Sequence, residues 1–386
     1  MNNFAFVNPV KILFGKNMIS EITKEIPSHY KVLVIYGGGS IKKNGVYDQV
    51  KNALKDYQWF EFSGIEPNPH YETCMQAVEV IKQKNIDYIL AVGGGSVIDA
   101  TKFIVAAACF EEGDPWRILA DKPNVVINKA LPFGTILTLS ATASEMNAGA
   151  VITKKETLEK LSFSSPLVYP KFSVLDPSVT FTLPPVQISN GVIDSFVHVI
   201  EQYLTYPVNG LLQDFMAESI LKVLIIDGPK ALKDPLNYDI RANLMWASTW
   251  ALNGWIACGV PQDWSTHLIG HELTAFYGID HAQTLAIVLP GVMKLQKEEK
   301  KEKILRLGRE VFSLQSDSTE ELINDSITAV ESFFHSMNIK TRLSDYNLGD
   351  DAIQKIYDRM EKREWKLGEH KNITANEIKK ILELRK

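Results

Sequence analysis

The chain has 386 residues, of which 23% are charged and 45% hydrophobic, and a formal net charge of −5. This length exceeds what one ordinary hydrophobic core fills, so at least two domains are predicted. The small negative charge gives no general attraction to phosphate backbones or anionic lipids, which argues against nucleic acid or a membrane as a partner. No apolar run approaches the roughly 18 residues of a membrane span, and the first residues lack a signal-peptide pattern. We therefore expect a cytoplasmic protein.

The first half of the chain alternates short β-branched runs with helical stretches. The N-terminal stretch FAFVNPVKILFG is expected to form one or two short strands at the margin of a sheet. Buried strands of a parallel sheet are predicted within residues 31–40, 87–96, 133–142 and 172–177. Such strands with crossover helices between them predict a doubly wound, Rossmann-like α/β domain over residues 1–183.

Long amphipathic segments replace the strand-like runs after FTLPP at residues 181–185, where paired prolines can end one element and open a helix. Helices are predicted at 210–233, 238–258, 263–277 and 298–313. Capping boxes are predicted at two further helix starts, Ser318 with Glu321 and Thr374 with Glu377. We expect an all-helical domain over residues 184–386.

The three cysteines, Cys74, Cys109 and Cys258, are odd in number and far apart. This spacing fits neither a disulfide framework nor a paired zinc motif. They are expected to be small buried hydrophobic residues.

Two glycine clusters follow predicted strands, YGGGSIKKNG at residues 36–45 and AVGGGS at 91–96. In the second cluster, backbone amides at the start of a helix could bind a diphosphate, which the helix dipole favours. Neither cluster matches the dinucleotide fingerprint, because the third fingerprint glycine is missing. Tight turns that need glycine dihedrals are the alternative. Two such turns at the carboxyl ends of strands nevertheless favour a ligand crevice.

A set of acidic and imidazole side chains recurs at helical spacing in the second half of the chain: Asp194, His198, Glu201, His267, His271 and His281. Residues four apart lie on one face of a helix, so Asp194 and His198 could reach one point. An aspartate with several histidines suits Zn²⁺ or Fe²⁺ and is too rich in nitrogen for Ca²⁺ or Mg²⁺. Spacing alone does not decide which of the later histidines is not a ligand, nor whether Glu201 replaces one.

Across nearly its full length the chain resembles the iron-containing alcohol dehydrogenases. Within them it is similar to the NADPH-dependent branch of broad-range aldehyde reductases and butanol dehydrogenases. The resemblance is carried by the stretches GGGSVIDATK, LTLSATASEMNAGAVI, VLDP, NGVIDSFVHVIEQY, GVPQDWSTHLIGHELTAFYGIDHAQTLAIVLP and TRLSDY. It implies a dehydroquinate synthase-like architecture, a homodimer, and reversible reduction of aldehydes to primary alcohols with NADP(H) and one divalent metal, Fe²⁺ or Zn²⁺.

The resemblance also assigns roles to individual residues. It implies that the metal is held by Asp194, His198, His267 and His281. His271 then stays near the substrate, where it could supply a proton to the product alkoxide, and Glu201 is a structural partner. The implied cofactor contacts are Asn68, Gly94, Gly95, Ser96, Asp99, Thr138, Thr142, Asn147 and Lys160. Ala143 departs from the glycine that the family usually has, and its methyl group could tighten the nicotinamide loop.

The first glycine cluster predicts the choice of NADPH over NADH. Enzymes that prefer NADH usually place an acidic residue near the end of the second strand, and in NADH-using relatives an Asp matches Gly38. The turn here offers no carboxylate. Gly38 leaves room for a 2′-phosphate, Ser40 can donate a hydrogen bond to it, and Lys42 or Lys43 adds positive charge.

Three other functions compete with this assignment. A metallohydrolase would want an Asp and His metal site but no phosphate-binding glycine turns. A catalytically idle nucleotide sensor would bind NADPH without turnover. The third is an enzyme of the same fold that acts on another substrate, either a polyol or glycerol-type dehydrogenase or a dehydroquinate synthase-like enzyme.

Overall fold

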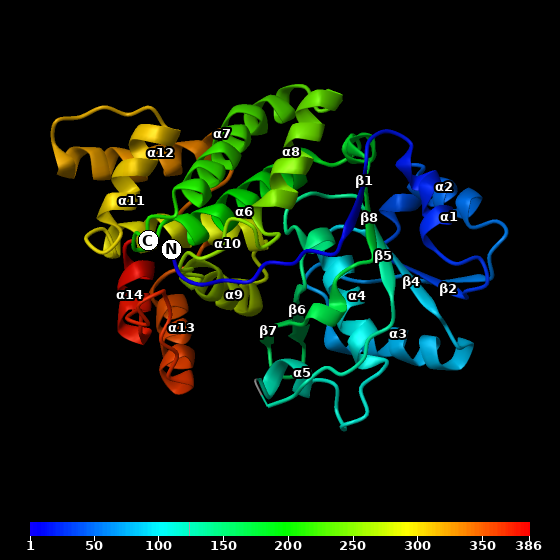
Figure 1. The fold of residues 1–386 in the computed structure, drawn as a ribbon. Coiled ribbons are helices and arrows are strands. Elements are labelled where there is room, and N and C mark those ends of the chain that lie inside the picture. Colours follow the sequence, from blue (N-terminus) through cyan, green and yellow to red (C-terminus); the bar gives the residue numbers. More distant parts are fainter. Residues whose placement is uncertain (123) are drawn as a thin grey trace. The chain divides into compact units, whose positions relative to one another are not determined.

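The computed structural model describes residues 1–122 and 124–386. By the contacts between its residues, this part of the chain falls into two compact units. The α/β unit comprises Val7–Leu183 and Leu236–Thr249, and the helical unit comprises Met1–Phe6, Pro184–Pro235 and Trp250–Lys386 (Figure 1). The boundary that we place between residues 183 and 184 stays a prediction.

A parallel sheet forms the centre of the α/β unit, as predicted. Among the described residues it has six strands in the order β1-β8-β5-β4-β2-β3. All neighbouring pairs in it are parallel. The strands are β1 (Lys11–Phe14), β2 (Val32–Tyr36), β3 (Trp59–Phe62), β4 (Tyr88–Gly93), β5 (Phe133–Leu137) and β8 (Phe172–Leu175). The predicted marginal strand is therefore β1, which lies at one end of the sheet.

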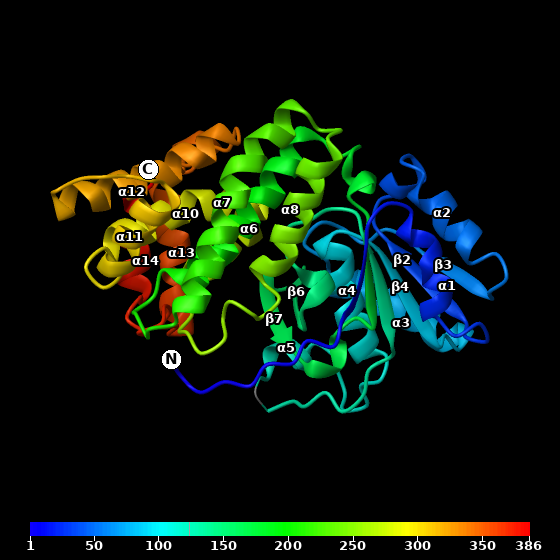
Figure 2. The same cartoon turned by 45° about the horizontal axis from the view of Figure 1, so that its top comes forward.

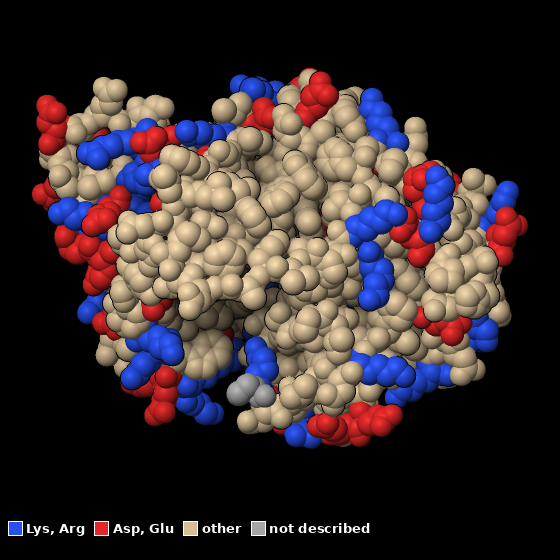
Figure 3. All heavy atoms as spheres, viewed as in Figure 1, with Lys and Arg blue, Asp and Glu red and all other residues tan. Residues whose placement is uncertain are grey.

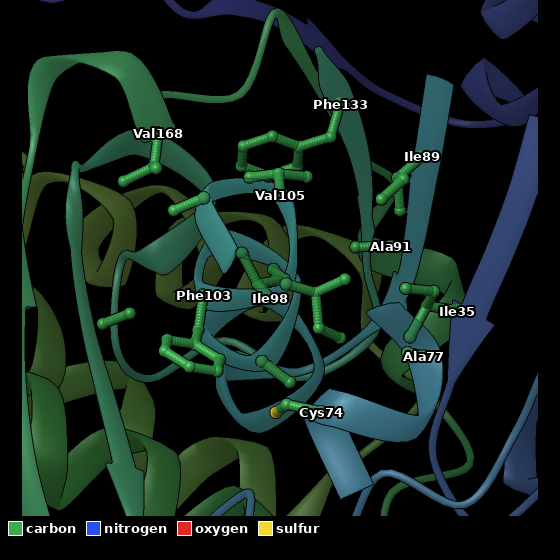
Figure 4. Close-up of a cluster of buried hydrophobic side chains, with 14 of the residues drawn as sticks. Ile35, Cys74, Ala77, Ile89, Ala91, Ile98, Phe103, Val105, Phe133 and Val168 are labelled. Atoms are coloured by element: carbon green, nitrogen blue, oxygen red, sulfur yellow. The ribbon is translucent and has the colours of Figure 1, made fainter. Parts of the chain in front are cut away.

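The sheet is covered on both faces, which confirms the doubly wound α/β architecture. Alternate residues of β2 enter two different cores, as the pleat of a strand requires. Leu33 and Ile35 pack with one core, whereas Val32 and Val34 pack with the other. Figure 4 shows the first of these cores, in which Phe103 and Cys74 lie among aliphatic side chains.

Helices and turns link the strands of the α/β unit. They are η1 (Met18–Glu21), α1 (Ile22–Glu25), η2 (Ser40–Lys42), α2 (Val46–Ala53), α3 (Tyr71–Lys84), α4 (Gly95–Ala107), α5 (Arg117–Ala120), η3 (Ser144–Met146), η4 (Pro166–Val168) and η5 (Pro177–Thr180). Helix α4 is almost wholly buried, so its polar side chains need internal partners.

Two features of the α/β unit escaped prediction. Strand β3 is a half-exposed edge strand, WFEF, without the β-branched run that marks a buried strand. Strands β6 (Gly149–Lys154) and β7 (Glu159–Ser164) form a separate antiparallel hairpin. One face of this hairpin is largely solvated and carries polar residues. The sequence therefore lacks the continuous apolar run by which the buried strands were predicted.

The chain after Leu175 is helical, as predicted, and its described residues form no further strand beyond an isolated bridge between Leu367 and Ile373. Its elements, seen at a second angle in Figure 2, are α6 (Pro185–Tyr203), α7 (Leu211–Lys233), α8 (Tyr238–Ala251), α9 (Ser265–Tyr277), α10 (His281–Leu295), α11 (Lys301–Arg306), η6 (Leu307–Val311), α12 (Thr319–Ser336), η7 (Ser344–Tyr346), α13 (Asp350–Arg363) and α14 (Ala375–Glu383). The paired prolines act as expected, since Pro185 is the first residue of α6.

Some predicted helix details were wrong. Helix α8 ends at Ala251 rather than at residue 258, and most of it belongs to the α/β unit. The capping box at Thr374 is present, whereas Ser318 has only half of one. Its hydroxyl accepts from the Glu321 amide, but the Glu321 carboxylate accepts from the Ser316 hydroxyl instead.

The cysteines behave mostly as small hydrophobic residues. Cys74 and Cys258 are buried, and burial raises the pKa of both thiols. Cys109 is partly exposed, so the expectation was wrong for that residue.

The surface charge and the hydropathy of the helices bear on whether a polyanion or a membrane is a partner. The described residues on the face drawn in Figure 3 form no extended patch of one charge sign. Acidic and basic side chains are interspersed on the face drawn in Figure 3. Among the described helices, none combines the length and hydrophobicity that a bilayer crossing needs.

Candidate metal centre and nucleotide site

Three helices of the helical unit carry the predicted metal ligands. Asp194 and His198 lie one turn apart on α6, His267 lies in the first turn of α9, and His281 is the first residue of α10. Ligand atoms of Asp194, His267 and His281 all lie within 4.8 Å of one another. The structure therefore brings together residues that are up to 87 positions apart in the sequence.

One carboxylate oxygen of Asp194 is the common point of this group. Nδ1 of His198 lies 3.7 Å from Asp194 Oδ1, and Nε2 of His267 lies 3.7 Å from the same atom. Nε2 of His281 lies 3.6 Å from it. The rings of His198 and His267 stack with centroids 4.6 Å apart. Asp194, His267 and His281 thus face one small volume, and His198 borders it through Nδ1.

Glu201 lies behind His267 rather than beside Asp194. Its Oε2 contacts Nδ1 of His267, and its Oε1 accepts a hydrogen bond of 2.6 Å from the Thr266 amide. Burial alone would lower the pKa of His267, but the charges of Glu201 and Asp194 raise it to about 9. A carboxylate on the far nitrogen of a ligand imidazole orients the ring and increases its basicity. The geometry favours Glu201 as an orienting partner over Glu201 as a ligand.

These residues fit a divalent transition metal. Nε2 of His267 is buried and has no hydrogen-bond partner among the described residues, so its lone pair or proton lacks compensation in the protein alone. One carboxylate with several imidazoles is a borderline donor set that Zn²⁺ and Fe²⁺ both accept.

A buried lysine that sequence reasoning missed ties two of the ligand helices together. Nζ of Lys300 donates to the carbonyl of Leu204, at the end of α6, over 2.7 Å. It also lies 2.8 Å from a carboxylate oxygen of Asp263 and 2.8 Å from one of Glu369. Burial alone would lower the pKa of Lys300, but these two carboxylates raise it, so the ammonium stays charged.

Asp263, the partner of Lys300, connects this network to the start of α9. Its Oδ1 accepts a hydrogen bond of 2.8 Å from the amide of Ser265, the first residue of the helix, which has no acceptor within the helix. Its own amide donates to the carbonyl of Glu201 at 2.9 Å. Between Asp263 and Ser265, Trp264 has a φ of 67°, a left-handed conformation that is costly for a bulky side chain. The indole of Trp264 packs against the His267 ring, with centroids 5.4 Å apart.

His271 lies beside the group without being one of its closest members. Its ring centroid is 5.2 Å from that of His281 and 6.4 Å from that of His267. The next residue, Glu272, is held by Arg359 at 3.0 Å and Arg363 at 2.6 Å, both from α13. These ion pairs fix α9 at the turn that carries His271.

In the α/β unit, the predicted cofactor residues gather at one edge of the sheet. Strands β5, β4 and β2 are neighbours, so the turns after them lie side by side. The order of strands reverses between β2 and β4, since β3 lies beyond β2 and β5 lies beyond β4. In open α/β sheets, ligands bind in the crevice at this switch point.

The glycines after β4 are needed for space. Their backbone is not left-handed, so the dihedral explanation that we considered does not apply to them. A Cβ on Gly93 would lie 2.5 Å from the Val97 side chain, and one on Gly95 would lie 2.5 Å from Thr142 Oγ1. The first amides of α4, from Gly95 and Ser96, have no acceptor within the helix.

Hydrogen bonds within the α/β unit hold four other predicted cofactor residues, Asn68, Asp99, Thr138 and Lys160. Lys160 Nζ donates to Asn68 Oδ1 over 2.9 Å, and the Thr138 amide donates to the Gly93 carbonyl over 3.0 Å. Both carboxylate oxygens of Asp99 accept protein hydrogen bonds, from the Ser144 hydroxyl at 2.6 Å and the Val151 amide at 2.9 Å. Asp99 therefore supports the loop after β5 in addition to any ribose contact.

In the first glycine cluster, Lys42 pairs with a carboxylate from a neighbouring part of the sheet. Lys42 Nζ lies 3.4 Å from Glu61 Oε2 and over the rings of Tyr36 and Tyr47. Both tyrosine hydroxyls donate to the Glu61 carboxylate, and with Lys42 they outweigh the effect of burial and lower its pKa. The turn itself has no carboxylate, as predicted, but Glu61 from β3 pairs with Lys42, which neutralises it. Lys43 is exposed.

Two family models match the chain. The model described as iron-containing alcohol dehydrogenase matches residues 9–177. The model of the Fe-containing alcohol dehydrogenase family, C-terminal, matches residues 188–385. The chain belongs to the iron-containing alcohol dehydrogenase family.

Individual relatives agree with this assignment. The chain is 51% identical over 385 residues to the NADPH-dependent aldehyde reductase YqhD of Escherichia coli, covering 99% of each chain. It is 41% identical to a probable NADH-dependent butanol dehydrogenase of Bacillus subtilis, again over 99% of each chain. Its fold matches a solved structure of NADH-dependent butanol dehydrogenase A from Thermotoga maritima, with a TM-score of 0.94, 38% identity and coverage of 100% and 99% of the two chains.

We expect replacement of single histidines to separate ligands from neighbours. His267→Ala and His281→Ala should lose bound metal, because each removes a donor atom from the group around Asp194. His271→Asn should keep it. Elemental analysis after dialysis against Zn²⁺ measures the outcome. A full equivalent of metal in either alanine variant, or its loss only from His271→Asn, would show that the wrong histidines were chosen.

The Lys300 network predicts a second difference. Lys300→Met should weaken Zn²⁺ binding by about ten- to a hundred-fold, the effect typical of outer partners of metal ligands. Lys303→Met is the matched control, because Lys303 is also buried and paired, with Asp214. Each variant removes one partner of a buried pair and should lose about 3–5 kcal/mol of stability, so stability alone does not distinguish them. Chelator competition does, and equal Zn²⁺ affinities in the two variants would refute the role of Lys300.

Proposed function

We propose that this chain reversibly reduces aldehydes to primary alcohols with NADPH, using one divalent metal, Fe²⁺ or Zn²⁺. The observation that carries the proposal is the convergence of His198, His267 and His281 on Asp194. It occurs in a chain that shares half its residues with an aldehyde reductase over nearly the whole length. A metallohydrolase would account for the metal centre but would leave the nucleotide features of the α/β unit without a purpose.

The proposed ligands are Asp194 and the three histidines around its carboxylate oxygen, His198, His267 and His281. Glu201 orients the ring of His267. When bound, the metal acts as a Lewis acid toward the aldehyde oxygen and NADPH supplies the hydride. The residues of the chain hold these groups and manage the proton. Burial of Asp194 and His198 keeps water from competing for the ligand atoms and strengthens electrostatic interactions.

His271 is the proposed proton donor. Its ring lies next to that of His281 and is itself largely buried. A histidine in this position can pass a proton to the alkoxide oxygen, directly or through a water. Because His271 is not one of the proposed ligands, this role leaves the metal site intact.

The nucleotide contacts are proposed from the turns after β2, β4 and β5. The amides of Gly94, Gly95 and Ser96 would hold the diphosphate at the start of α4, with Asp99 near the ribose. The remaining contacts are Thr138, Thr142 and Asn147 toward the nicotinamide, and Asn68 and Lys160 at the flanks.

NADPH is favoured over NADH by the turn after β2. Gly38 is exposed, and a Cβ added there would meet nothing within 4 Å, which leaves room for a 2′-phosphate beside Ser40. Pairing of Lys42 with Glu61 leaves Lys43 as the cation for the phosphate and removes the repulsion that Glu61 would exert.

The proposal also covers the substrates, the cellular location and the oligomeric state of the enzyme. Its substrates are small aldehydes and alcohols. We place it in the cytoplasm as a homodimer that pairs through the edge strand β1, which has β8 as its neighbour on one side.

The reaction is tested by NADPH oxidation at 340 nm with short, long and aromatic aldehydes. Metal-stripped protein should be inactive, and return of Zn²⁺ or Fe²⁺ should restore turnover. His271→Asn, loaded with metal, should have kcat lowered by about 10²-fold because the proton donor is gone. No oxidation of NADPH by the reconstituted wild type across the panel would leave a nucleotide sensor or a hydrolase as the better description. Activity confined to diols and glycerol-like substrates would point to a polyol dehydrogenase.

Cofactor choice is tested by a pair of variants that differ only in charge. Gly38→Asp should weaken NADPH use by about ten- to a thousand-fold, since a carboxylate about 4 Å from the phosphate costs about 1 to 4 kcal/mol per charge pair. Gly38→Asn has the same shape and should stay close to wild type. Values of kcat/KM for NADPH and NADH measure both. If the Asp variant keeps its NADPH kcat/KM, or if the wild type uses NADH equally well, the assignment of this turn is wrong.

The dimer is tested at the free side of β1. The amides of Lys11 and Gly15 donate to carbonyls of Lys171 and Leu175 on the β8 side. Because alternate amides of a strand point to opposite sides, that of Ile12 points away from β8. Ile12→Pro removes this donor and should give a monomer by light scattering at micromolar concentration, whereas Ile12→Ala should remain dimeric. A monomeric wild type, or a dimeric proline variant, would contradict pairing through this edge.

A further inference from the structure

Lys102 is a fully buried lysine of the α/β unit that the proposed reaction does not use. It lies on α4, and none of its side chain is exposed. Among the described residues no carboxylate lies within ion-pair distance of its ammonium group. A buried charge without an ion pair is costly and is kept only where its hydrogen bonds are needed.

The hydrogen bonds of Lys102 all go to one loop. Its Nζ donates to Oδ1 of Asn147 and to the carbonyl of Gly149, each over 2.7 Å. Oδ1 of Asn147 also accepts from the Gly149 amide at 3.1 Å, and its Nδ2 donates to the carbonyl of Thr142 at 3.2 Å. One ammonium group thus fixes both ends of the segment Thr142–Gly149.

This loop needs such an anchor, because its backbone is strained. Ala143 has a φ of 50°, in the left-handed region that glycine adopts at no cost and alanine does not. The loop also lies directly against the start of α4, where Thr142 Oγ1 occupies the space that a Cβ on Gly95 would fill. A small shift of the loop would therefore change the shape of the surface around the first amides of α4.

We propose that Lys102 is a positioning residue for NADPH, which holds the loop Thr142–Gly149 in the conformation that the nicotinamide half of the cofactor requires. The inference rests on the proposed function, because Thr142 and Asn147 are the proposed contacts on that side. Lys102 acts through Asn147 and does not itself touch the cofactor. Its ammonium makes up for the glycine that is absent at residue 143.

The test compares Lys102→Met, which keeps the length of the side chain and removes the donors, with Thr101→Val. Thr101 is the matched control, since it is equally buried on α4 and its hydroxyl donates only within the helix, to the Val97 carbonyl. The dissociation constant of NADPH is measured by fluorescence without aldehyde. Hydrogen exchange of a peptide spanning residues 140–151 is followed with and without NADPH, and metal content is determined in parallel.

Lys102→Met should retain its metal and bind NADPH about ten- to a hundred-fold more weakly, as expected for loss of charge-assisted hydrogen bonds. Its loop should exchange faster than in the wild type. Thr101→Val should match the wild type in both readouts. A folded Lys102→Met with wild-type NADPH affinity and wild-type exchange would overturn the inference. If this variant does not fold, Lys102→Gln, which is one atom shorter and removes the charge while keeping a polar group, decides by the same two criteria. Wild-type protein that fails to bind NADPH would instead refute the proposed function.

Discussion

A single buried carboxylate oxygen, Oδ1 of Asp194, is the point on which the helical unit converges. Three imidazole nitrogens lie 3.6 to 3.7 Å from it. Burial penalises polar groups that lack a partner, so a metal ion or a proton shared among these groups would stabilise them. The helices α6, α9 and α10 must therefore pack so that Asp194, in the middle of α6, meets His267 and His281 in the first turns of the other two. Their packing follows from that requirement as much as from their apolar faces.

The two units use the same device to hold their functional segments, a buried lysine bonded to main-chain carbonyls. Lys300 joins the end of α6 to the start of α9 through Leu204 and Asp263. Lys102 joins α4 to the loop around Asn147. The difference between them is the counter-charge. Lys300 has two carboxylates, and its pKa is raised, whereas burial lowers the pKa of Lys102 to about 8. Lys300 therefore holds its helices through a compensated charge, whereas Lys102 holds the loop around Asn147 through hydrogen bonds alone.

The class of fold and the grouping of Asp194, His267 and His281 could be predicted because both have local signals. Buried strands such as Val32–Tyr36 are continuous β-branched runs, and a carboxylate and an imidazole four residues apart share a helix face. Spacing alone does not separate His271 from the other histidines, and its place outside the ligand set, which the family resemblance implies, stays a prediction. Strand β3 and the β6–β7 hairpin were missed, because half-exposed polar strands lack a distinctive period.

Side-chain contacts between residues that lie far apart in the sequence could not be predicted, because no local sequence pattern indicates them. Nothing near Lys42 predicts that Glu61, on a neighbouring strand, would neutralise it. The bonds of Lys300 to Asp263 and of Lys102 to Asn147 likewise join residues separated by tens of positions. Such contacts depend on how elements pack after they form, so they become visible only in the three-dimensional structure.

The central claim is that Asp194, His198, His267 and His281 bind the catalytic metal while His271 stays outside. Anomalous diffraction from crystals of the Zn²⁺-loaded protein, collected on both sides of the zinc absorption edge, tests this most directly. We predict one strong peak about 2.0 to 2.2 Å from a ligand atom of each of the four residues. A peak bonded to His271 or Glu201 in place of one of them, or no peak near Asp194 in fully loaded and active protein, would contradict the account.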